Sequence, residues 1–376
     1  MPYNFYMVEQ DAAKLNVGPR IRALRERCAL TLSAVRERTG IGVSSLSELE
    51  TGKRDPTVIQ LKSLAECFHS SIAELLSDAP PEPMAVRWRE RPADGAAEIE
   101  ARFEQLCRQY HHLERWADEE VAVQLPCAPV YPGGAGEVEA LARRVRAQLN
   151  LGDRPGLALR KALEDDCGVK LFHARFDPTG TAACAWHPEY GPAVLLNARN
   201  SAARRTFDLA HELFHLLTWG VRGRRPSERL DEQFAGVFAS ALLMPEDALR
   251  EAIERRRREN RISSANLCEL ARDFRVSIDA ILWRAHRVYG WKDGARTEAL
   301  IADARRALAA YRDFTPDRED EVPELPERYR ALAIQCLRRG DIAVGRAAEY
   351  LGIRRWAAMK YVELPGDHDE VTLPAP

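Results

Sequence analysis

The residues best suited to do chemistry stand in the five-residue pattern His211-Glu212-Leu213-Phe214-His215. On a helix, residues four positions apart share one face, so both imidazoles can bind a single metal ion. Two imidazoles suit zinc, which in catalytic sites takes three protein ligands and keeps one position open. Glu212 then lies within reach of a water molecule that the metal would activate, and it can take the proton of that water. The pattern predicts a hydrolytic zinc site; the alternative is a surface helix that carries two histidines.

A third ligand is expected on the next helix, which the apolar pattern predicts over residues 228 to 243. Glu232 shares a face of that helix with small and apolar positions that would pack inward. A buried carboxylate is costly unless it is paired or bound to a metal, so Glu232 is the preferred third ligand. Glu228, one turn earlier on the same face, is the alternative, whereas Asp231 faces the aromatic side of the helix. One zinc ion per chain is therefore expected on His211, His215 and Glu232, with Glu212 as the catalytic base.

The elements that must hold this site change from strand-like to helical patterns along the chain. Apolar runs bounded by turn residues predict strands over 169–176, 181–187 and 193–197. Amphipathic spacing then predicts a series of helices, over residues 201–219, 228–243, 246–260, 264–273 and 277–288. The region is expected to form an α+β, zincin-like domain in which a small sheet precedes the metal-binding helix.

A second block, residues 17 to 77, has helical apolar spacing interrupted only by short turns, which predicts four or five short helices. Its second helix, 32 to 39, stops at Gly40, and another begins at residues 42 to 44. This is a helix-turn-helix pattern, in which the second helix enters the major groove of DNA with its N-terminus first. The expected DNA contacts are Ser44, Ser45 and Ser47, whose hydroxyls can contact bases or phosphates, and Lys53 and Arg54, which can reach phosphates.

The charge of this block is modest, since it holds nine lysines and arginines against seven acidic residues, a net charge of +2. Phosphate contacts supply most of the sequence-independent affinity for DNA, so a single copy should bind weakly. A homodimer on an inverted-repeat operator is therefore expected. The alternative is that the block contacts another protein instead of DNA.

The segment RRTFDLAHELFHLL, with FAGVFASALLMPEDAL downstream, resembles the ImmA/IrrE family of metallopeptidases over about residues 137 to 250. The resemblance implies that His211, His215 and a downstream glutamate hold zinc and that Glu212 is the general base. This chain has phenylalanine where the family usually has glycine inside the motif. It also has phenylalanine directly before Ala235, where the family commonly has glutamate, which leaves Glu232 as the ligand by position.

The block at 17 to 77, with the string RIRALRERCALTLSAVRERTGIGVSSLSELETGKRDP at its start, resembles the XRE-type helix-turn-helix, the phage-repressor fold.

For the ImmA/IrrE family, the resemblance implies proteolysis of a helix-turn-helix repressor as a stress or mobile-element switch. The two resemblances together suggest a repressor that carries its own protease, or a sensor derived from one.

The predicted fold class is mainly α, with an all-α block, an α+β domain and a small C-terminal helical unit. The predicted domains are 17–77, a linker and helical connector at 78–136, a peptidase domain at 137–314, and the C-terminal unit at 326–363. The sequence of the C-terminal unit also has a helix-turn-helix pattern. It is interpreted as a structural cap in preference to a second DNA-binding motif.

The composition of the chain excludes several classes of protein. The 376 residues carry a formal net charge of −2, and no apolar run exceeds five residues, far below the ~20 that span a bilayer. No two of the eight cysteines lie within four residues of each other, which excludes a CxxC motif and favours a reduced, cytoplasmic protein. We expect a cytoplasmic transcriptional regulator with a gated zinc endopeptidase that cleaves a repressor or regulatory protein, in cis or in trans. The alternatives are a ligand-sensing regulator that cuts nothing and an antitoxin-like DNA-binding module.

Overall fold

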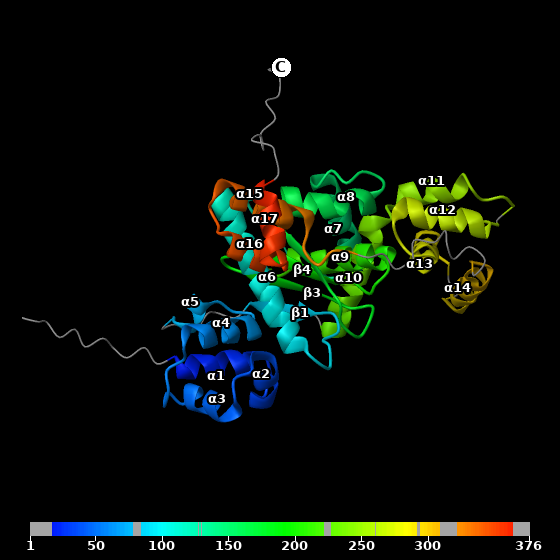
Figure 1. The fold of residues 1–376 in the computed structure, drawn as a ribbon. Helices are drawn as coiled ribbons and strands as arrows, with labels where there is room; N and C mark the ends of the chain where they lie inside the picture. The colour runs from blue at the N-terminus through cyan, green and yellow to red at the C-terminus, as the bar shows by residue number, and fades with distance from the viewer. Residues whose placement is uncertain are drawn as a thin grey trace, which may run out of the picture. The chain divides into compact units, whose positions relative to one another are not determined.

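The computed structural model describes residues 17–77, 84–126, 128, 130–221, 227–259, 261–291, 294–308 and 322–363. The chain divides into two units (Figure 1). Unit 1 comprises the chain up to Pro83 together with Ala93–Leu106, and unit 2 comprises Met84–Pro92 and everything from Cys107 onward. Helices predominate in both units, which confirms the prediction of a mainly α protein. Residues 78 to 83 of the predicted connector and 309 to 314 of the predicted peptidase domain lie outside the described residues.

Unit 1 is built from short helices with well-defined caps. Its helices are α1 (Gly18–Arg27), α2 (Leu32–Thr39), α3 (Val43–Glu50), α4 (Val58–Cys67), α5 (Ile72–Leu75) and the first part of α6 (Ala96–Ala117). Thr31 accepts a hydrogen bond from the start of α2, and Thr57 forms a capping box at the start of α4. Gly40 ends α2 with a φ of 72°, a conformation that glycine adopts without strain. The predicted set of short helices and tight turns is confirmed.

The position of α3 is fixed by close contact with α1. A side chain at Gly18 would place its Cβ 2.8 Å from the carbonyl oxygen of Glu50 and nearer still to that of Leu49. Glycine is therefore required at the start of α1. Arg25 of α1 adds two hydrogen bonds to the Glu50 carboxylate, at 2.7 and 3.0 Å. The exposed face of α3 is in this way held rigidly to the rest of unit 1.

Unit 2 contains a four-stranded mixed sheet with the order β1-β3-β4-β2. The strands are β1 (Ala85–Trp88), β2 (Lys170–Ala174), β3 (Ala182–His187) and β4 (Gly191–Asn197). The three strands predicted from the sequence are confirmed as β2, β3 and β4. Strand β1 lies in the segment that the sequence analysis assigned to the connector, and it pairs antiparallel with β3 so that Arg87 stands opposite Cys184.

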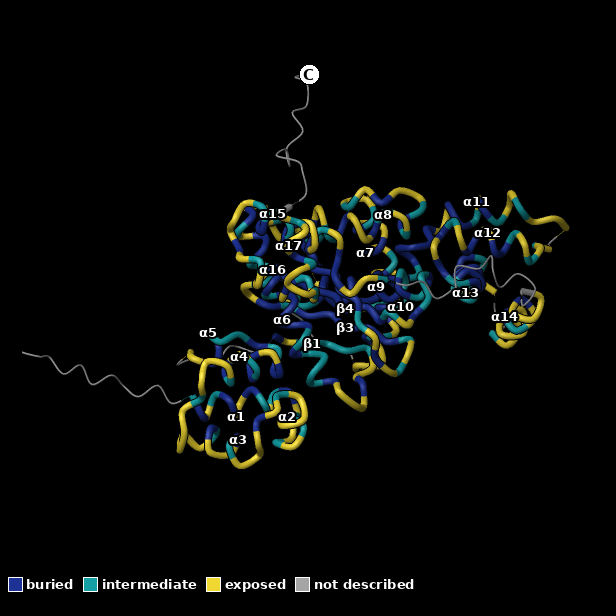
Figure 2. Tube along the Cα trace, in the orientation of Figure 1, coloured by how far each residue is buried: buried dark blue, intermediate teal, exposed yellow. Residues whose placement is uncertain are grey.

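Helices surround this sheet. They are α7 (Ala135–Gln148), α8 (Pro155–Lys161), the π-helix η1 (Ala162–Asp166), α9 (Ala202–Leu217), α10 (Glu228–Leu243), α11 (Glu246–Glu254), α12 (Ser264–Phe274), α13 (Ile278–Val288) and α14 (Gly294–Leu308). Helix α9 packs on β3 and β4, and α10 packs against both α7 and α9. Figure 2 shows burial concentrated along β3, β4, α9 and α10. Within the described parts of the chain, no helix combines the length and apolar character needed to cross a membrane.

The C-terminal helices α15 (Glu327–Arg339), α16 (Val344–Leu351) and α17 (Arg355–Glu363) are part of unit 2. Tyr329 of α15 is fully buried, and its hydroxyl donates to Gln109 of α6 at 3.0 Å. Arg328 pairs with Glu114 of α6 at 2.5 Å. The backbone N–H of His173 in β2 donates to the carbonyl of Glu324 at 3.1 Å. These contacts favour the interpretation of this segment as a structural cap on the sheet.

Candidate metal centre

Helix α9 carries the HExxH pattern and is anchored before the pattern begins. Ser201 caps its first turn by accepting from the N–H of Arg204 at 3.2 Å. One turn before the first histidine, the buried Asp208 accepts from Asn200 at 2.8 Å and pairs with Arg204 at 2.8 Å. Arg89, which follows strand β1, adds an ion pair to Asp208 at 3.2 Å. The helix is thus tied to the loop before it and to the segment after β1.

The structure brings three donor groups to one point. Nε2 of His211 lies 3.3 Å from Nε2 of His215 and 2.9 Å from Oε2 of Glu232. Nε2 of His215 lies 3.2 Å from Oε1 of Glu232. Donors bound to a tetrahedral zinc ion at ~2.0–2.2 Å are separated by roughly 3.3 Å, so the spacing of this cluster fits a zinc ion. Within the described residues, these three are the one group of potential ligands that converges in this way.

The protonation of His211 and Glu232 also suits a metal. Burial lowers the pKa of His211 to about 4, so its imidazole is neutral at physiological pH. Burial tends to raise the pKa of Glu232, but hydrogen bonds to both histidines outweigh burial and lower it, so the carboxylate is ionised. Neutral imidazoles and an ionised carboxylate are the forms that bind zinc.

The two other acidic residues of α10 that were considered as the third ligand, Glu228 and Asp231, lie in different surroundings. Glu228 is exposed and does not belong to the cluster. Asp231 is buried and points toward the site, where it accepts hydrogen bonds from Tyr131 and Arg87. Its Oδ2 lies 3.7 Å from Nδ1 of His215, on the opposite side of that ring from the donor cluster. Asp231 therefore lies on the Nδ1 side of His215, away from the donor cluster, and makes no hydrogen bond to that ring.

Arg87 is a site residue that the sequence analysis missed. It donates from β1 to Asp231 and, at 3.1 Å, to Oε1 of Glu232. With a side chain only 22% exposed, it is held by these two carboxylates of α10. The pairing of β1 with β3 brings it to the site, although it lies more than 140 residues from its partners along the chain.

Glu212 is completely buried beside the cluster, and neither of its carboxylate oxygens has a hydrogen-bond partner among the described residues. Burial raises the pKa of Glu212 to about 7, while the His215 imidazole and the Cys184 thiol act in the opposite direction. A group that titrates near neutral pH is suited to both accept and release a proton. Burial raises the pKa of Cys184, so its thiol in β3 stays protonated next to Glu212.

The sequence-predicted DNA contacts lie together on unit 1. Ser44 and Ser47 are exposed on α3, and Lys53 and Arg54 are exposed in the turn that follows. Ser45 is partly buried, which leaves it less free to reach a base than its neighbours. The first turn of α3 begins at Gly42 without a side-chain cap, so its N–H groups are open to an anion such as phosphate. This surface fits the recognition helix of a helix-turn-helix.

The fold and the site together define a helix-turn-helix protein with a metallopeptidase-like second unit. The family model "Helix-turn-helix" matches residues 21–75, and the model "IrrE N-terminal-like domain" matches residues 164–286. The chain belongs to the helix-turn-helix transcriptional regulators, and its second unit carries an IrrE N-terminal-like peptidase domain.

Two curated proteins are each similar to a part of this chain. The chain is 39% identical over 77 residues to the uncharacterized HTH-type transcriptional regulator y4dJ of Sinorhizobium fredii, covering 20% of this chain and 99% of that protein. It is 32% identical over 126 residues to the radiation response metalloprotease IrrE of Deinococcus radiodurans, covering 31% of this chain and 37% of that protein. The chain therefore spans little more than a third of that relative. The crystal structure of ComR from Streptococcus suis aligns over 92% of this chain and 86% of its own, at 14% identity and a TM-score of 0.16, too low to bear on the fold.

Proposed function

We propose that this chain is a cytoplasmic DNA-binding regulator whose second unit is a zinc-dependent peptidase that cleaves a repressor or another regulatory protein. The observation that carries the proposal is the meeting of His211, His215 and Glu232 beside the fully buried Glu212, whose polar neighbour is the Cys184 thiol. A structural zinc site does not need a fourth buried acidic or imidazole group of this kind, and burying a carboxylate without a charged partner is costly. A hydrolytic site uses it to move a proton.

Three residues would hold the metal: His211, His215 and Glu232. When bound, zinc supplies a Lewis acid that polarises a peptide carbonyl and lowers the pKa of water towards ~7. Glu212 would take the proton of the attacking water and deliver it to the nitrogen of the leaving amine. Arg87, which donates to Glu232, would keep that carboxylate in place during this exchange.

The substrate is proposed to be a helix-turn-helix protein, either unit 1 of the same chain or a separate repressor. Because both units belong to one polypeptide, cleavage in cis would need no encounter between separate molecules. The proposed DNA target is an operator with two-fold symmetry that a homodimer reads through α3. Ser44, Ser45 and Ser47 would contact bases, and Lys53 and Arg54 would contact phosphates.

The test compares the wild-type chain with Glu212→Gln. Both are loaded with zinc and incubated with repressors encoded next to this gene, and fragments are identified by mass spectrometry. The variant should keep its fold and its zinc and cleave more slowly by a factor of about 10²–10⁴, the usual contribution of a general base. Equal fragment patterns from both proteins would assign the cleavage to a contaminating protease. Absence of wild-type cleavage, with zinc bound, would reject the peptidase.

A second candidate function is a regulator whose metal-containing unit responds to a small molecule without cutting protein. A specific observation favours it, namely a large cavity among α11–α14 that plays no part in the metal centre. Operator binding measured with and without small ligands, in the Glu212→Gln background, separates the two functions. A ligand effect that survives this substitution belongs to the sensor.

A further inference from the structure

A cavity of about 810 Å³ lies between the turn after α11 and helices α12, α13 and α14. It shares no residue with the His211, His215 and Glu232 cluster. Helix α14, which forms one wall, begins at Gly294, beyond the residues 164–286 that match the peptidase family. Sites for small organic ligands have volumes of about 300–1,000 Å³, so this cavity has the size of a binding site.

The cavity has mainly aliphatic walls. Its lining includes Ile253, Leu267, Ile281, Leu282 and Leu300. Two aromatic rings at the mouth, Tyr289 and Trp291, stack with their centroids 6.1 Å apart and their planes inclined by 19°. Trp291 and Leu300 remain 39% and 41% exposed, and apolar surface left open to water is costly unless something covers it. The walls therefore fit a ligand with an aliphatic body.

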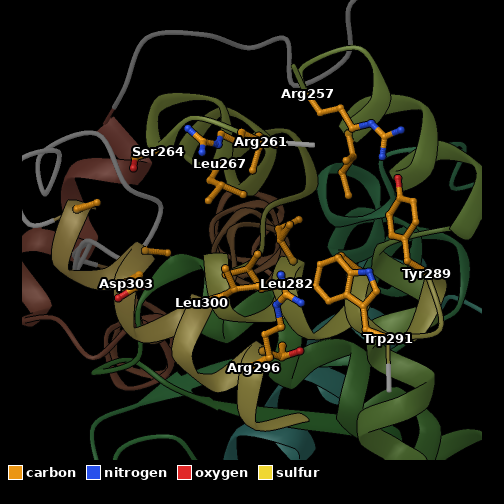
Figure 3. A pocket seen from close by; sticks show the side chains of 17 residues that line it. Arg257, Arg261, Ser264, Leu267, Leu282, Tyr289, Trp291, Arg296, Leu300 and Asp303 are labelled. Carbon is orange, nitrogen blue, oxygen red and sulfur yellow. The ribbon is translucent and has the colours of Figure 1, made fainter. Parts of the chain in front are cut away.

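The charges around the cavity are mostly positive. Arg257, Arg261 and Arg296 line it together with a single acidic residue, Asp303, and Figure 3 places Asp303 across the cavity from Arg257. Asp303 is itself paired with Arg306, which does not line the cavity. Among the described residues, Arg261 has no ion-pair partner, so one lining cation is available to a ligand. A ligand with an anionic group would therefore complement the charge of the cavity lining.

We propose that this cavity binds a small amphipathic anion, with its aliphatic body among the leucines and isoleucines and its carboxylate or phosphate at Arg261, while Arg296 adds positive charge to the lining. Arg257 contributes less, because it already pairs with Glu254 at 2.8 Å. The proposal is independent of peptidase activity, since it rests on residues outside the metal centre.

The experiment is isothermal titration calorimetry on the full chain with four probes of equal chain length: octanoate, octyl phosphate, 1-octanol and octylamine. One of the two anions should bind at least about tenfold more tightly than the alcohol and the amine, because its head group meets Arg261 in a lining with more positive than negative charge. Comparison of octanoate with octyl phosphate identifies the preferred head group. Equal affinity for all four probes would mean unspecific apolar binding and would overturn the proposal.

Two variants locate the bound anion. The double substitution Arg261→Glu and Arg296→Glu should weaken its binding by about tenfold or more. Ala307→Trp, on the exposed wall of α14, should also weaken it because the added ring occupies part of the cavity. Arg258→Glu is the matched control, since Arg258 is exposed on the same turn and does not line the cavity. Circular dichroism verifies that each variant folds. Unchanged anion affinity in the double variant and in Ala307→Trp would place the anion elsewhere and reject this site.

Discussion

Arg87 and Asp231 are 144 residues apart in the sequence and form an ion pair directly behind the histidine cluster. The same guanidinium also reaches Glu232, so the edge strand β1 and helix α10 are joined at the metal centre. Tyr131 supplies a further hydrogen bond to Asp231. The Asp231 carboxylate is almost fully buried. A buried charge is costly without partners, so Asp231 depends on the hydrogen bonds from Arg87 and Tyr131.

Removal of Arg87 should therefore destabilise unit 2. We expect Arg87→Met to lower the free energy of unfolding by about 3 kcal/mol, because it leaves a buried carboxylate short of its charged partner. Asp231→Asn in the same background should recover most of the loss. Urea unfolding measures both, and Arg115→Met, which removes an exposed ion pair to Glu120, is the control with a change below about 0.5 kcal/mol. Equal effects at Arg87 and Arg115 would contradict the importance of the pair.

The third ligand is tested by two substitutions on one helix. Glu232→Gln should reduce zinc affinity by about 100-fold or more, since outer partners of ligands alone typically contribute 10–100-fold. Glu228→Gln, one turn earlier and exposed, should leave zinc affinity unchanged. Competition with a chelator measures both constants. The reverse order of effects would transfer the ligand role to Glu228.

Acid stability should depend on His173. Burial lowers the pKa of His173 to about 4, and the neighbouring Arg160 and Arg205 add to this effect against a hydrogen bond to the Pro323 backbone. In the unfolded chain the ring gains its proton near pH 6.5, so the stabilising contribution is full above that pH and is lost as the pH falls towards 4. The loss amounts to about 3 kcal/mol. His173→Gln should flatten the pH dependence of unfolding between 6.5 and 4; an unaltered slope would show that His173 titrates normally.

DNA binding should separate into two kinds of contact. Lys53→Ala should weaken binding to every sequence and reduce the salt dependence of the logarithm of the affinity by about one unit. Ser44→Ala with Ser47→Ala should instead relax the preference for the operator. Fluorescence anisotropy with upstream and random DNA at several salt concentrations distinguishes them. Lys62→Ala on α4 is the control for loss of an exposed charge. Equal affinity of the wild type for both DNAs would reject the operator.

The sequence predicted the parts of the site that local patterns encode. The spacing of His211 and His215 on an apolar helix, and the place of Glu232 on the next helix, predicted a shared site, and the three donor groups lie together in the structure; their role as zinc ligands stays a prediction. The strands next to them were predicted because their apolar runs end at turn residues. All of these signals lie within a few residues of the groups concerned.

The contribution of β1 had no such local signal. The strand is four residues long, Ala85–Trp88, and its pairing with β3 spans about a hundred residues. No local pattern marks Arg87 and Arg89 as site residues, because their partners Asp231 and Asp208 are distant in the sequence. The sequence likewise placed Asp231 among aromatic neighbours, since its donors Arg87 and Tyr131 come from other elements.

The way in which the chain is divided between the two units matters for any regulation by proteolysis. Unit 1 includes Ala93–Leu106, which follows β1 in the sequence. Ala101 belongs to the core of unit 1, and Arg38 of α2 holds Glu98 of α6 with two hydrogen bonds, at 2.6 and 2.9 Å. Arg27 of α1 also pairs with Glu104 at 3.6 Å.

A single break between residues 78 and 83 would therefore separate the polypeptide without separating the DNA-binding helices from the rest. The severed helices would still be held by the first half of α6, in the manner of a nicked protein whose fragments stay associated. Release from such a complex depends on how tightly α6 packs, and it is slowed by every contact that Glu98, Ala101 and Glu104 make. Cleavage between residues 78 and 83 would therefore release the DNA-binding helices only after a delay, whose length is set by how fast the two fragments dissociate.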